Sequence, residues 1–240
     1  NAFGSRVVWN GSEYGIFYVD NRYGDTNIFF IRMSSTGSVV GTDSLISIDD
    51  STDINENTFE AVWNGENYGL IYRDGNDIIF VLVSNTGSTL AGPTIVSSGS
   101  TATRSDFIWN GYEFAMVYLD SALTDYNAFF ARFNASGSQI GTSTLLTPDD
   151  TINANYPRIT WTGYEYGVVY YSNETGVNDI YLARVDSAGN EIGSEIRITP
   201  NDAFAALDPR ILWTGERYAL AYKDNRTGSY DTYLAIVHPS

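Results

Sequence analysis

Hydrophobic residues in this chain come in short runs that are separated by turn-forming residues, and each run has the length of a β-strand. Arg158-Ile-Thr-Trp161 and Tyr166-Gly-Val-Val-Tyr170 flank a Thr-Gly pair, which is typical of a tight hairpin. A third run, Ile180-Tyr-Leu-Ala183, is apolar on both faces, and a short fourth run, Ile196-Arg-Ile198, follows it, as Leu45-Ile-Ser-Ile48 does in the first unit. Glycine and proline interrupt the chain too often for a helical period. The pattern therefore predicts units of four strands.

The same unit recurs five times, and the tryptophans mark it. Each tryptophan is followed by glycine two positions later, by an aromatic ring five positions later and by tyrosine nine positions later. The spacing is about 50 residues, at the upper end of the periods typical of repeat architectures. We interpret the chain as a single domain of five repeats, with approximate bounds 1–57, 58–104, 105–156, 157–208 and 209–240. The five tryptophans are Trp9, Trp63, Trp109, Trp161 and Trp213.

Four antiparallel strands per repeat, apolar on both faces, suit the blades of a β-propeller, because each blade is packed between two neighbours. The sequence thus predicts an all-β fold, a five-bladed β-propeller with four antiparallel strands per blade. The last unit stops after its third strand, so we expect a three-stranded last blade with an exposed edge that could pair with another chain. An open stack of sheets is the alternative, whereas five tandem immunoglobulin-like sandwiches would each need about 100 residues.

The Trp-Asn/Thr-Gly motif resembles the repeats of bacterial extracellular propeller proteins over nearly the whole chain. In overall plan the chain is similar to tachylectin-type lectins and to arabinanase-type glycosidases, both of which are five-bladed. The resemblance implies the fold and leaves the function open, since one fold hosts many activities. In arabinanase-like enzymes, three acids stand at the inner-strand starts of successive blades. Here the first of these positions is Arg6, which departs from that pattern.

Charge narrows the range of partners. The chain has 13 basic and 29 acidic residues, a net charge of −16, and no cysteine. This field repels phosphate backbones and anionic lipids, so nucleic acid is not expected as a partner. No apolar run reaches the ~20 residues of a membrane span, so membrane insertion is not expected either. An acidic surface maintains solubility and fits an extracellular or cell-surface location.

A ring of charged residues is the first candidate site. A charged residue stands three positions before each tryptophan, at the start of each presumed inner strand: Arg6, Glu60, Asp106, Arg158 and Arg210. In a propeller these side chains would gather at the mouth of the central channel and form a site for an anion or a sugar. Glu60 and Asp106 could serve as the acid pair of a glycoside hydrolase. The alternative interpretation is a ring of ion pairs that neutralise one another.

The loops after the recurring tyrosine are rich in aspartate and asparagine. Their oxygens suit calcium, a hard cation, and they equally suit Asx-turns that hydrogen-bond their own backbone. The recurrence of an Asx residue just before every third strand favours the turn role. Calcium is the one cofactor considered, and its candidate ligands are Asp20, Asp25, Asp120, Asp125, Asp224 and Asp231. The only histidine, His238, excludes a histidine-centred triad or metal site.

The aromatic residues fall into two groups. We expect the tryptophans and the recurring tyrosines in the core, because burial of each ring is worth roughly 4–6 kcal/mol before opposing terms. Tyr23, Tyr126 and Tyr230 lie in the variable loops and are candidates for ligand contacts, or else ordinary exposed rings.

The sequence as a whole favours a secreted or cell-surface binding module that is lectin-like and performs no chemistry. Its expected partner is a glycan or another cell-surface polymer, bound either at several similar weak sites between blades, which gain from multivalency, or at one site at the channel mouth. Two alternatives stay open. One is a glycoside hydrolase that uses Glu60 and Asp106, and the other is a structural or adhesive repeat segment of a larger surface protein.

Overall fold

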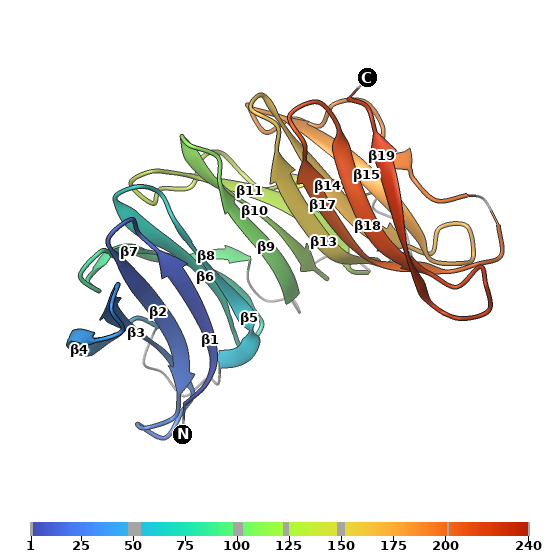
Figure 1. Ribbon diagram of the computed structural model, residues 1–240. Coiled ribbons are helices and arrows are strands. Elements are labelled where there is room, and N and C mark those ends of the chain that lie inside the picture. The colour runs from blue at the N-terminus through green and yellow to red at the C-terminus, as the bar shows by residue number, and fades with distance from the viewer. Residues whose placement is uncertain are drawn as a thin grey trace.

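The computed structural model describes residues 2–47, 54–97, 103–121, 125–147, 152–200 and 202–239. In these ranges five antiparallel sheets follow one another along the chain (Figure 1). We call each sheet a blade and number the blades in chain order. Blades 1 to 4 have four strands and blade 5 has three, which confirms the predicted all-β architecture and the short last sheet. No helix in these ranges is long and apolar enough to cross a membrane.

The strands have the following bounds. Blade 1 contains β1 (Ala2–Trp9), β2 (Glu13–Asp20), β3 (Asn27–Ser34) and β4 (Val39–Leu45). Blade 2 contains β5 (Ile54–Trp63), β6 (Asn67–Asp74), β7 (Asp77–Ser84) and β8 (Thr89–Ser97). Blade 3 contains β9 (Thr103–Trp109), β10 (Glu113–Asp120), β11 (Asn127–Asn134) and β12 (Thr144–Leu145). Blade 4 contains β13 (Ala154–Trp161), β14 (Glu165–Ser172), β15 (Asp179–Asp186) and β16 (Ile196–Arg197). Blade 5 contains β17 (Ala206–Trp213), β18 (Tyr218–Asp224) and β19 (Asp231–Val237).

The repeated Trp-Asn/Thr-Gly motif forms the first hairpin of each blade. In blade 1, Asn10 Oδ1 accepts the backbone N–H of Ser12 and of Glu13, each at 2.9 Å. Gly11 follows with φ of 99°, in the left-handed region where a side chain is strained. In blade 4, Thr162 Oγ1 replaces the asparagine and accepts the N–H of Glu165 at 3.0 Å. The motif is therefore a turn signal, and it determines where the second strand begins.

The fourth strand differs from its prediction in blade 1. The apolar run placed it at residues 45–48, whereas β4 spans Val39–Leu45 and begins just after the turn at Gly37. This strand lies at the outer edge of the blade and none of its residues is buried, so its sequence lacks a continuous apolar run. Backbone pairing with β3 needs no hydrophobic pattern, and the prediction missed it for that reason.

The hydrophobic core lies between the blades. Four clusters of buried residues each join two successive blades, from blades 1 and 2 through to blades 4 and 5. At the interface of blades 1 and 2, the Phe30 ring packs 5.3 Å from the Tyr68 ring. Glycine on the facing strand lets the incoming ring approach closely, because a Cβ at Gly15 would lie 2.6 Å from the Tyr68 ring. Each blade is thus buried through its contact with the next one.

A charged triad crosses the interface of blades 4 and 5. Arg184 pairs with Glu165 of the same blade at 2.8 Å, and the Tyr218 hydroxyl of blade 5 donates to Glu165 at 2.6 Å. Burial alone would raise the pKa of Glu165, but the Arg184 and Tyr218 donors bring it below its usual range. The same arrangement joins blades 3 and 4 through Arg132, Glu113 and Tyr166.

The interface of blades 2 and 3 lacks this triad, and all three of its members change together. The arginine position is Leu82, the glutamate position is Asn67 and the tyrosine position is Phe114. Phe114 is fully buried and packs 5.6 Å from the Phe80 ring. The hydroxyl is absent where no carboxylate could accept its hydrogen bond, since a buried unpaired hydroxyl is costly.

The outer faces of blades 1 and 5 are exposed. Leu234 in blade 5 is 69% exposed, whereas its equivalents in blades 1 to 4 are at most 1% exposed. Val7 in blade 1 is 60% exposed, whereas its equivalents in blades 3 and 4 are at most 5% exposed. The buried equivalents of Leu234 are Phe30, Phe80, Phe130 and Leu182, and those of Val7 are Phe107 and Ile159.

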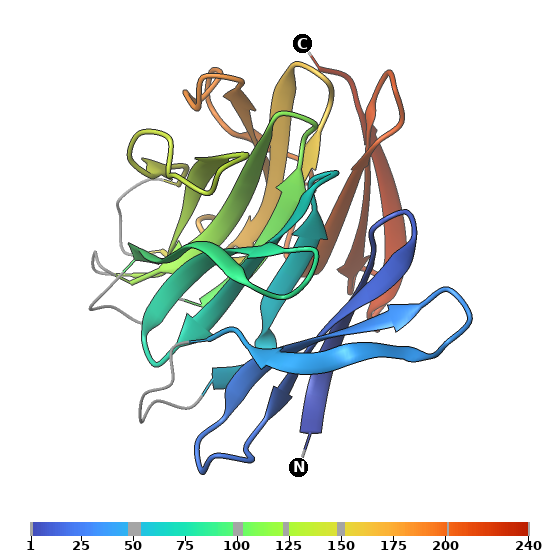
Figure 2. The ribbon, with the colours of Figure 1, turned by 90° about the vertical axis from the view of Figure 1, so that its left-hand side faces the viewer.

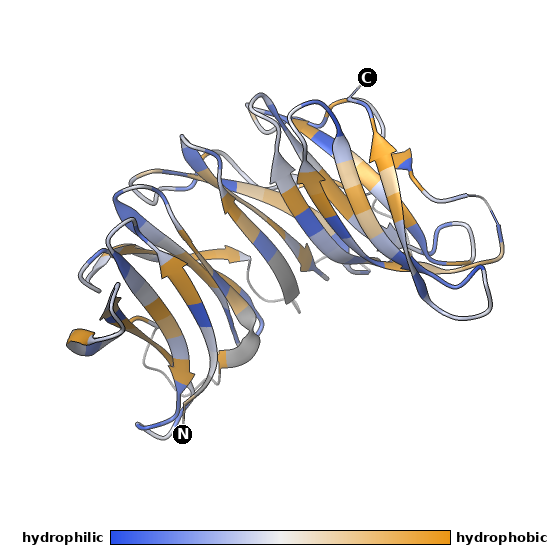
Figure 3. Cartoon of the chain, in the orientation of Figure 1, coloured by the Kyte–Doolittle hydropathy of each residue, from blue (hydrophilic) through white to orange (hydrophobic). Residues whose placement is uncertain are grey.

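Blades 1 and 5 stand at the two ends of an arc (Figures 1 and 2). None of the four core clusters in the described ranges contains residues of both blades. Hydrophobic residues are visible on β18 and β19 (Figure 3). Closure of the five blades into a ring stays a prediction.

The tryptophans lie nearer the surface than expected. None of the five belongs to the buried core, and Trp9 is 45% exposed. Each ends its strand beside the turn and packs on the aromatic residue five positions later, as Trp9 does on Tyr14 with ring centroids 4.7 Å apart. The recurring tyrosines fit the core prediction better, since Tyr72, Tyr118, Tyr170 and Tyr222 are buried, while Tyr18 is half-buried.

The repeat supplies a matched pair of positions that tests this packing. We expect Leu182→Ala to lower the free energy of unfolding by about 2–5 kcal/mol, because it leaves a cavity between blades 4 and 5. Leu234→Ala, at the equivalent exposed position, should cost less than about 1 kcal/mol. Chemical denaturation of both variants measures the difference. Equal losses would show that the outer face of blade 5 is covered in solution.

Candidate functional site

The five charged positions predicted as a ring lie on the inner strands β1, β5, β9, β13 and β17, and the structure divides them into different roles. Arg6 and Glu60 neutralise each other through two hydrogen bonds, Nε to Oε2 at 3.0 Å and Nη2 to Oε1 at 3.1 Å. The Arg6 guanidinium also lies 4.8 Å from the centroid of the Phe59 ring. This part of the ring matches the ion-pair interpretation.

Asp106 is tied to the next blade. Its Oδ2 accepts the backbone N–H of Ile159 at 2.9 Å, which links β9 to β13. Burial raises the pKa of the Asp106 carboxyl, and the nearby Glu60 adds to the rise, while the Ile159 N–H and Arg158 oppose it. Asp106 is therefore a carboxyl group whose charged form the fold disfavours.

Arg158 and Arg210 have no carboxylate partner in the described ranges. Arg158 Nη1 donates to the carbonyl of Pro157 at 2.9 Å, and Arg210 Nη1 donates to that of Pro209 at 3.2 Å. Burial lowers the pKa of the Arg158 guanidinium, and the like charge of Arg210 lowers it further against the attraction of Asp106. The two guanidinium groups thus hold positive charge that an anion would stabilise.

A pocket of about 350 Å³ adjoins Arg210. Lys223 lies in its wall and pairs with Asp208 at 2.6 Å. The Tyr156 ring stacks on Tyr171 with centroids 5.6 Å apart, which holds an aromatic face at the pocket. The lining residues are Tyr156, Asp208, Arg210, Ala221, Tyr222, Lys223 and Thr232.

The backbone of this pocket is strained at two equivalent positions. Tyr156 and Asp208 have φ of 51° and 52°, and they are the only non-glycine residues with positive φ in the described ranges. Each stands five residues before the tryptophan of its blade, at a bulge where the first strand changes register with the second. Such conformations cost of order 1–3 kcal/mol and are concentrated at binding sites. The equivalent position in blade 1 is Gly4, with φ of 60° at the same kind of bulge, so only blades 4 and 5 carry a side chain in this conformation among the three.

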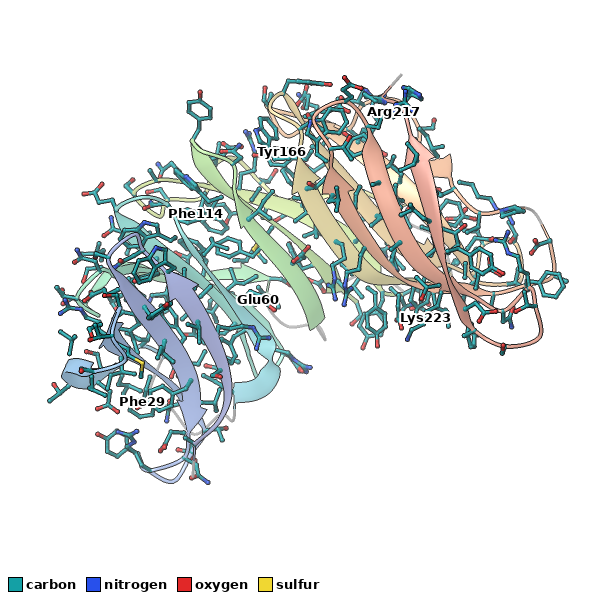
Figure 4. All side chains as sticks on the ribbon, viewed as in Figure 1. Phe29, Glu60, Phe114, Tyr166, Arg217 and Lys223 are labelled. Carbon is teal, nitrogen blue, oxygen red and sulfur yellow. The ribbon has the colours of Figure 1, made fainter. Side chains whose placement is uncertain are left out.

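Figure 4 shows how the two ends of the blades differ. Glu60 and Lys223 lie toward the end where the inner strands begin, and Tyr166 and Arg217 lie toward the opposite, hairpin end. The basic side chains of Arg158, Arg210 and Lys223 belong to neighbouring blades 4 and 5. In a chain with a net charge of −16, this is a local concentration of positive charge.

The three loop tyrosines come from three different blades, and each has its own surroundings. Tyr23 is 64% exposed and lies 5.9 Å from the Phe29 ring. Tyr126 is partly buried and packs against the cluster between blades 3 and 4. Tyr230 is 51% exposed. None of the three lines the pocket beside Arg210.

The candidate calcium ligands make local hydrogen bonds. Asp20 accepts hydrogen bonds from the backbone N–H and the side-chain Nε of Arg22, at 2.7 and 3.0 Å. Asp224 accepts a hydrogen bond from the backbone N–H of Arg226 at 2.8 Å. Asp120 accepts from Ser97, and Asp231 from Thr227. The backbone oxygens of Asp25 and Asp125 accept from the side-chain amides two residues later. Across the described ranges no three carboxylate or histidine side chains gather as a metal site, so the arrangement favours the turn interpretation.

The sequence interpretation overlooked an aromatic pocket at the hairpin end. This pocket, of about 370 Å³, lies between blades 3 and 4 and is lined by Tyr112, Tyr164 and Trp161 among others. Tyr112 is 81% exposed and Tyr164 is 57% exposed. The signal was present in the repeat, because this turn position is polar in the other blades. The polar equivalents are Ser12, Glu66 and Glu216.

Solved structures share this fold. Neither a protein-family model nor a curated protein matches the sequence. Oligopeptidase B from Trypanosoma brucei is similar with a TM-score of 0.56 and 12% identity, over 98% of this chain and 34% of that protein. A subtype N10 neuraminidase-like protein of A/little yellow-shouldered bat/Guatemala gives a TM-score of 0.53 and 11% identity, over 99% of this chain and 84% of that protein. An endo-arabinase from Bacteroides thetaiotaomicron gives a TM-score of 0.46 and 12% identity, over 98% of this chain and 94% of that protein.

At these identities the likeness shows the fold alone. A peptidase and a neuraminidase-like protein are both similar to this chain, so the fold does not select an activity. The chain has the fold of the β-propeller class, and its function has to be argued from the site.

Asp106 gives the site a pH dependence that can be measured. Its folded pKa is raised above the ordinary value of about 3.9, so the folded state binds its proton more tightly than the unfolded state does. Stability from this group is present at low pH and is lost as pH rises through the folded pKa. Between pH 7 and pH 4, the free energy of unfolding of the wild type should therefore rise relative to that of Asp106→Asn.

Denaturant titrations of both proteins at the two pH values provide the comparison, and the effects of other carboxyl groups cancel in the difference. A change in the opposite direction would mean that the fold favours the charged form of Asp106.

Proposed function

We propose that this chain is a secreted or cell-surface binding module of the lectin type, which holds a glycan bearing a carboxylate and performs no chemistry on it. The observation that carries the proposal is the pair Arg158 and Arg210, two arginines without a carboxylate partner in the described ranges. A planar guanidinium group matches a carboxylate in a two-point hydrogen-bonded geometry, so this pair suits an acidic sugar.

The surroundings of the pair support a sugar rather than a simple anion. Tyr156 presents an aromatic ring, and Thr232 and Asp208 add polar groups that suit hydroxyl ligands. Ligand sites commonly combine apolar walls with a few placed polar groups. The exposed Tyr112 and Tyr164 at the hairpin end are further aromatic contacts for a polymer that extends over the surface.

Closure of the five blades into one ring belongs to this proposal as well. A closed ring would bring Arg6 and Glu60 of blades 1 and 2 toward Arg158 and Arg210. All five predicted ring residues would then surround one channel mouth, as in the lectin interpretation.

A glycoside hydrolase that uses Glu60 and Asp106 is the second candidate. The raised pKa of Asp106 favours it, because a general acid has to keep its proton near neutral pH. The pairing of Glu60 with Arg6 weighs against it, since both Glu60 oxygens already accept hydrogen bonds. We therefore rank binding above catalysis.

A structural or adhesive segment is the third candidate. Its support is β19, the edge strand of the three-stranded blade 5, whose outward backbone groups could pair with another chain. This candidate function does not require a ligand at Arg158 and Arg210.

A matched set of glycans tests the binding proposal. Isothermal titration should show that oligogalacturonate binds and that its methyl ester, which lacks the charge, binds at least 10-fold more weakly. Arg158→Gln and Arg210→Gln should each weaken binding of the acid form by about 10-fold to 100-fold, because a hydrogen bond to a charged group is worth about 1.5–3 kcal/mol.

Arg217→Gln is the control, since Arg217 is an exposed arginine at the opposite end of the blades. Its affinity should equal that of the wild type. Equal binding of the acid and its ester would contradict the role of the arginine pair. Cleavage products that disappear in Glu60→Gln would favour the hydrolase, and the absence of binding to a broad glycan array, with and without calcium, would favour the structural segment.

A further inference from the structure

The aromatic pocket at the hairpin end of blades 3 and 4 is built from residues that the other repeats lack. The residue three positions after the tryptophan is tyrosine only in these two blades, as Tyr112 and Tyr164. Both rings line the pocket of about 370 Å³, together with Trp161 of blade 4. This volume falls within the range of about 300–1000 Å³ that is typical of ligand pockets. Two successive blades thus bring three aromatic rings to one opening.

Two of the three rings are held in place by packing. Trp161 packs on Tyr166 of the same blade with ring centroids 4.4 Å apart. Tyr164 meets the Trp213 ring of blade 5 edge to face, with centroids 6.3 Å apart. These contacts arrange part of the pocket before a ligand binds, which lowers the entropy cost of binding. Tyr112 is 81% exposed, so its ring is the wall that a ligand would bury.

The hairpin turn itself does not require tyrosine at this position. In blade 1 the position is Ser12, whose backbone N–H donates to Asn10 Oδ1 at 2.9 Å. In blade 3 the backbone N–H of Tyr112 makes the same bond to Asn110 Oδ1 at 2.8 Å. Because Tyr112 and Tyr164 stay largely exposed, their rings add little to the core. Exposed apolar groups that gather at one place are typical of a binding site.

The polar side chains of the pocket are largely used within the protein. Asn110 Oδ1 accepts the backbone N–H of Tyr112 and of Glu113, each at 2.8 Å, and Asn110 Nδ2 donates to the Tyr166 hydroxyl at 2.6 Å. Glu113 Oε1 accepts from the Tyr166 hydroxyl at 2.7 Å, and both Glu113 oxygens accept from Arg132 at 3.3 Å. A sugar gives up hydrogen bonds to water on binding and needs replacements for them. The pocket therefore favours a ligand that needs few hydrogen bonds.

The charge around the pocket favours a cation. In the described ranges no residue that lines it is basic, and the Glu113 carboxylate is among the lining groups. Arg132 neutralises part of this charge, but the chain as a whole has a net charge of −16. The faces of tyrosine and tryptophan rings carry negative potential and attract a positive group. A cation is thus attracted by the rings, by the carboxylate and by the field of the whole chain.

We propose that this pocket binds a trimethylammonium group, as found in choline. Such a group is positively charged, has no N–H to donate, and presents methyl groups to the aromatic faces. The pocket lies beside Tyr166, whose hydroxyl contacts Asn110, at the hairpin end of the blades (Figure 4). Lys223, in the wall of the pocket at Arg210, lies toward the opposite end. The site is therefore separate from the one proposed for an acidic glycan.

Isothermal titration of the purified chain with choline chloride tests the proposal. Choline should bind saturably, and 3,3-dimethylbutan-1-ol, which has the same shape without the charge, should bind at least about 5-fold more weakly. Tyr112→Ser and Tyr164→Ser should each weaken choline binding by about 3-fold to 30-fold, because each removes one ring from the cation. Serine is the natural residue at this turn position in blade 1, so both variants should fold, and circular dichroism checks this.

Glu66→Ser is the matched control. It places serine at the same turn position in blade 2, and Glu66 does not line the pocket. This variant should bind choline like the wild type. Tyr112→Phe retains the ring and removes only the hydroxyl, so it should recover most of the affinity that Tyr112→Ser loses.

Sedimentation with phosphatidylcholine vesicles identifies the source of the group. Sedimentation that free choline reverses would assign the pocket to lipid head groups. A chain that binds choline and does not sediment would assign it to soluble molecules that carry the group. Either result retains trimethylammonium as the ligand.

Four results would overturn the proposal. Absence of saturable choline binding up to tens of millimolar would show that the pocket does not take the cation. Equal binding of choline and its uncharged analogue would reduce the site to an apolar pocket. Wild-type affinity in both serine variants would place choline elsewhere. Binding of methyl galactoside that the serine variants lose, without binding of choline, would assign the pocket to a neutral sugar. No acidic glycan is used in these titrations, so failure of either proposal leaves the other standing.

Discussion

The contact between neighbouring blades is the interaction on which this structure depends. A single antiparallel sheet of three or four strands is apolar on both faces here and cannot bury either face by itself. The Phe30 ring needs Tyr68 of the next blade, and Leu182 needs Tyr218. Stability is consequently a property of pairs of blades, as in other repeat proteins, and an end blade has one face without a neighbour. The exposed Leu234 and Val7 are direct consequences.

The inter-blade interfaces also show that the same three positions can be filled by a charged triad or by uncharged side chains. Glu165, Arg184 and Tyr218 form a triad whose members all have partners, while Asn67, Leu82 and Phe114 fill the equivalent space without charge. A mixture of the two sets would leave a buried hydroxyl or a carboxylate unpaired, and such groups cost more than either complete set. At the interface of blades 2 and 3 all three residues are replaced together.

The candidate site is distinguished by which basic side chains have an acidic partner. In an acidic chain, Arg6 is neutralised by Glu60, and Lys223 by Asp208. Arg158 and Arg210 are left as neighbouring cations, and the strained backbone at Tyr156 and Asp208 lies beside them. Stability alone does not explain the two neighbouring cations. They fit a site that is completed by a ligand with negative charge.

The sequence by itself determined the five repeats, the four-stranded antiparallel sheets and the short last sheet, because turn residues and strand patterns act over a few neighbouring positions. Trp9 to Gly11 defines its hairpin without reference to the rest of the chain. Only the tertiary structure decided that Glu60 is neutralised by Arg6 while Arg158 is not, that the tryptophans stay near the surface, and that Leu234 is exposed. These properties depend on which blade faces which, and residues about 50 positions apart carry no local signal of their contact.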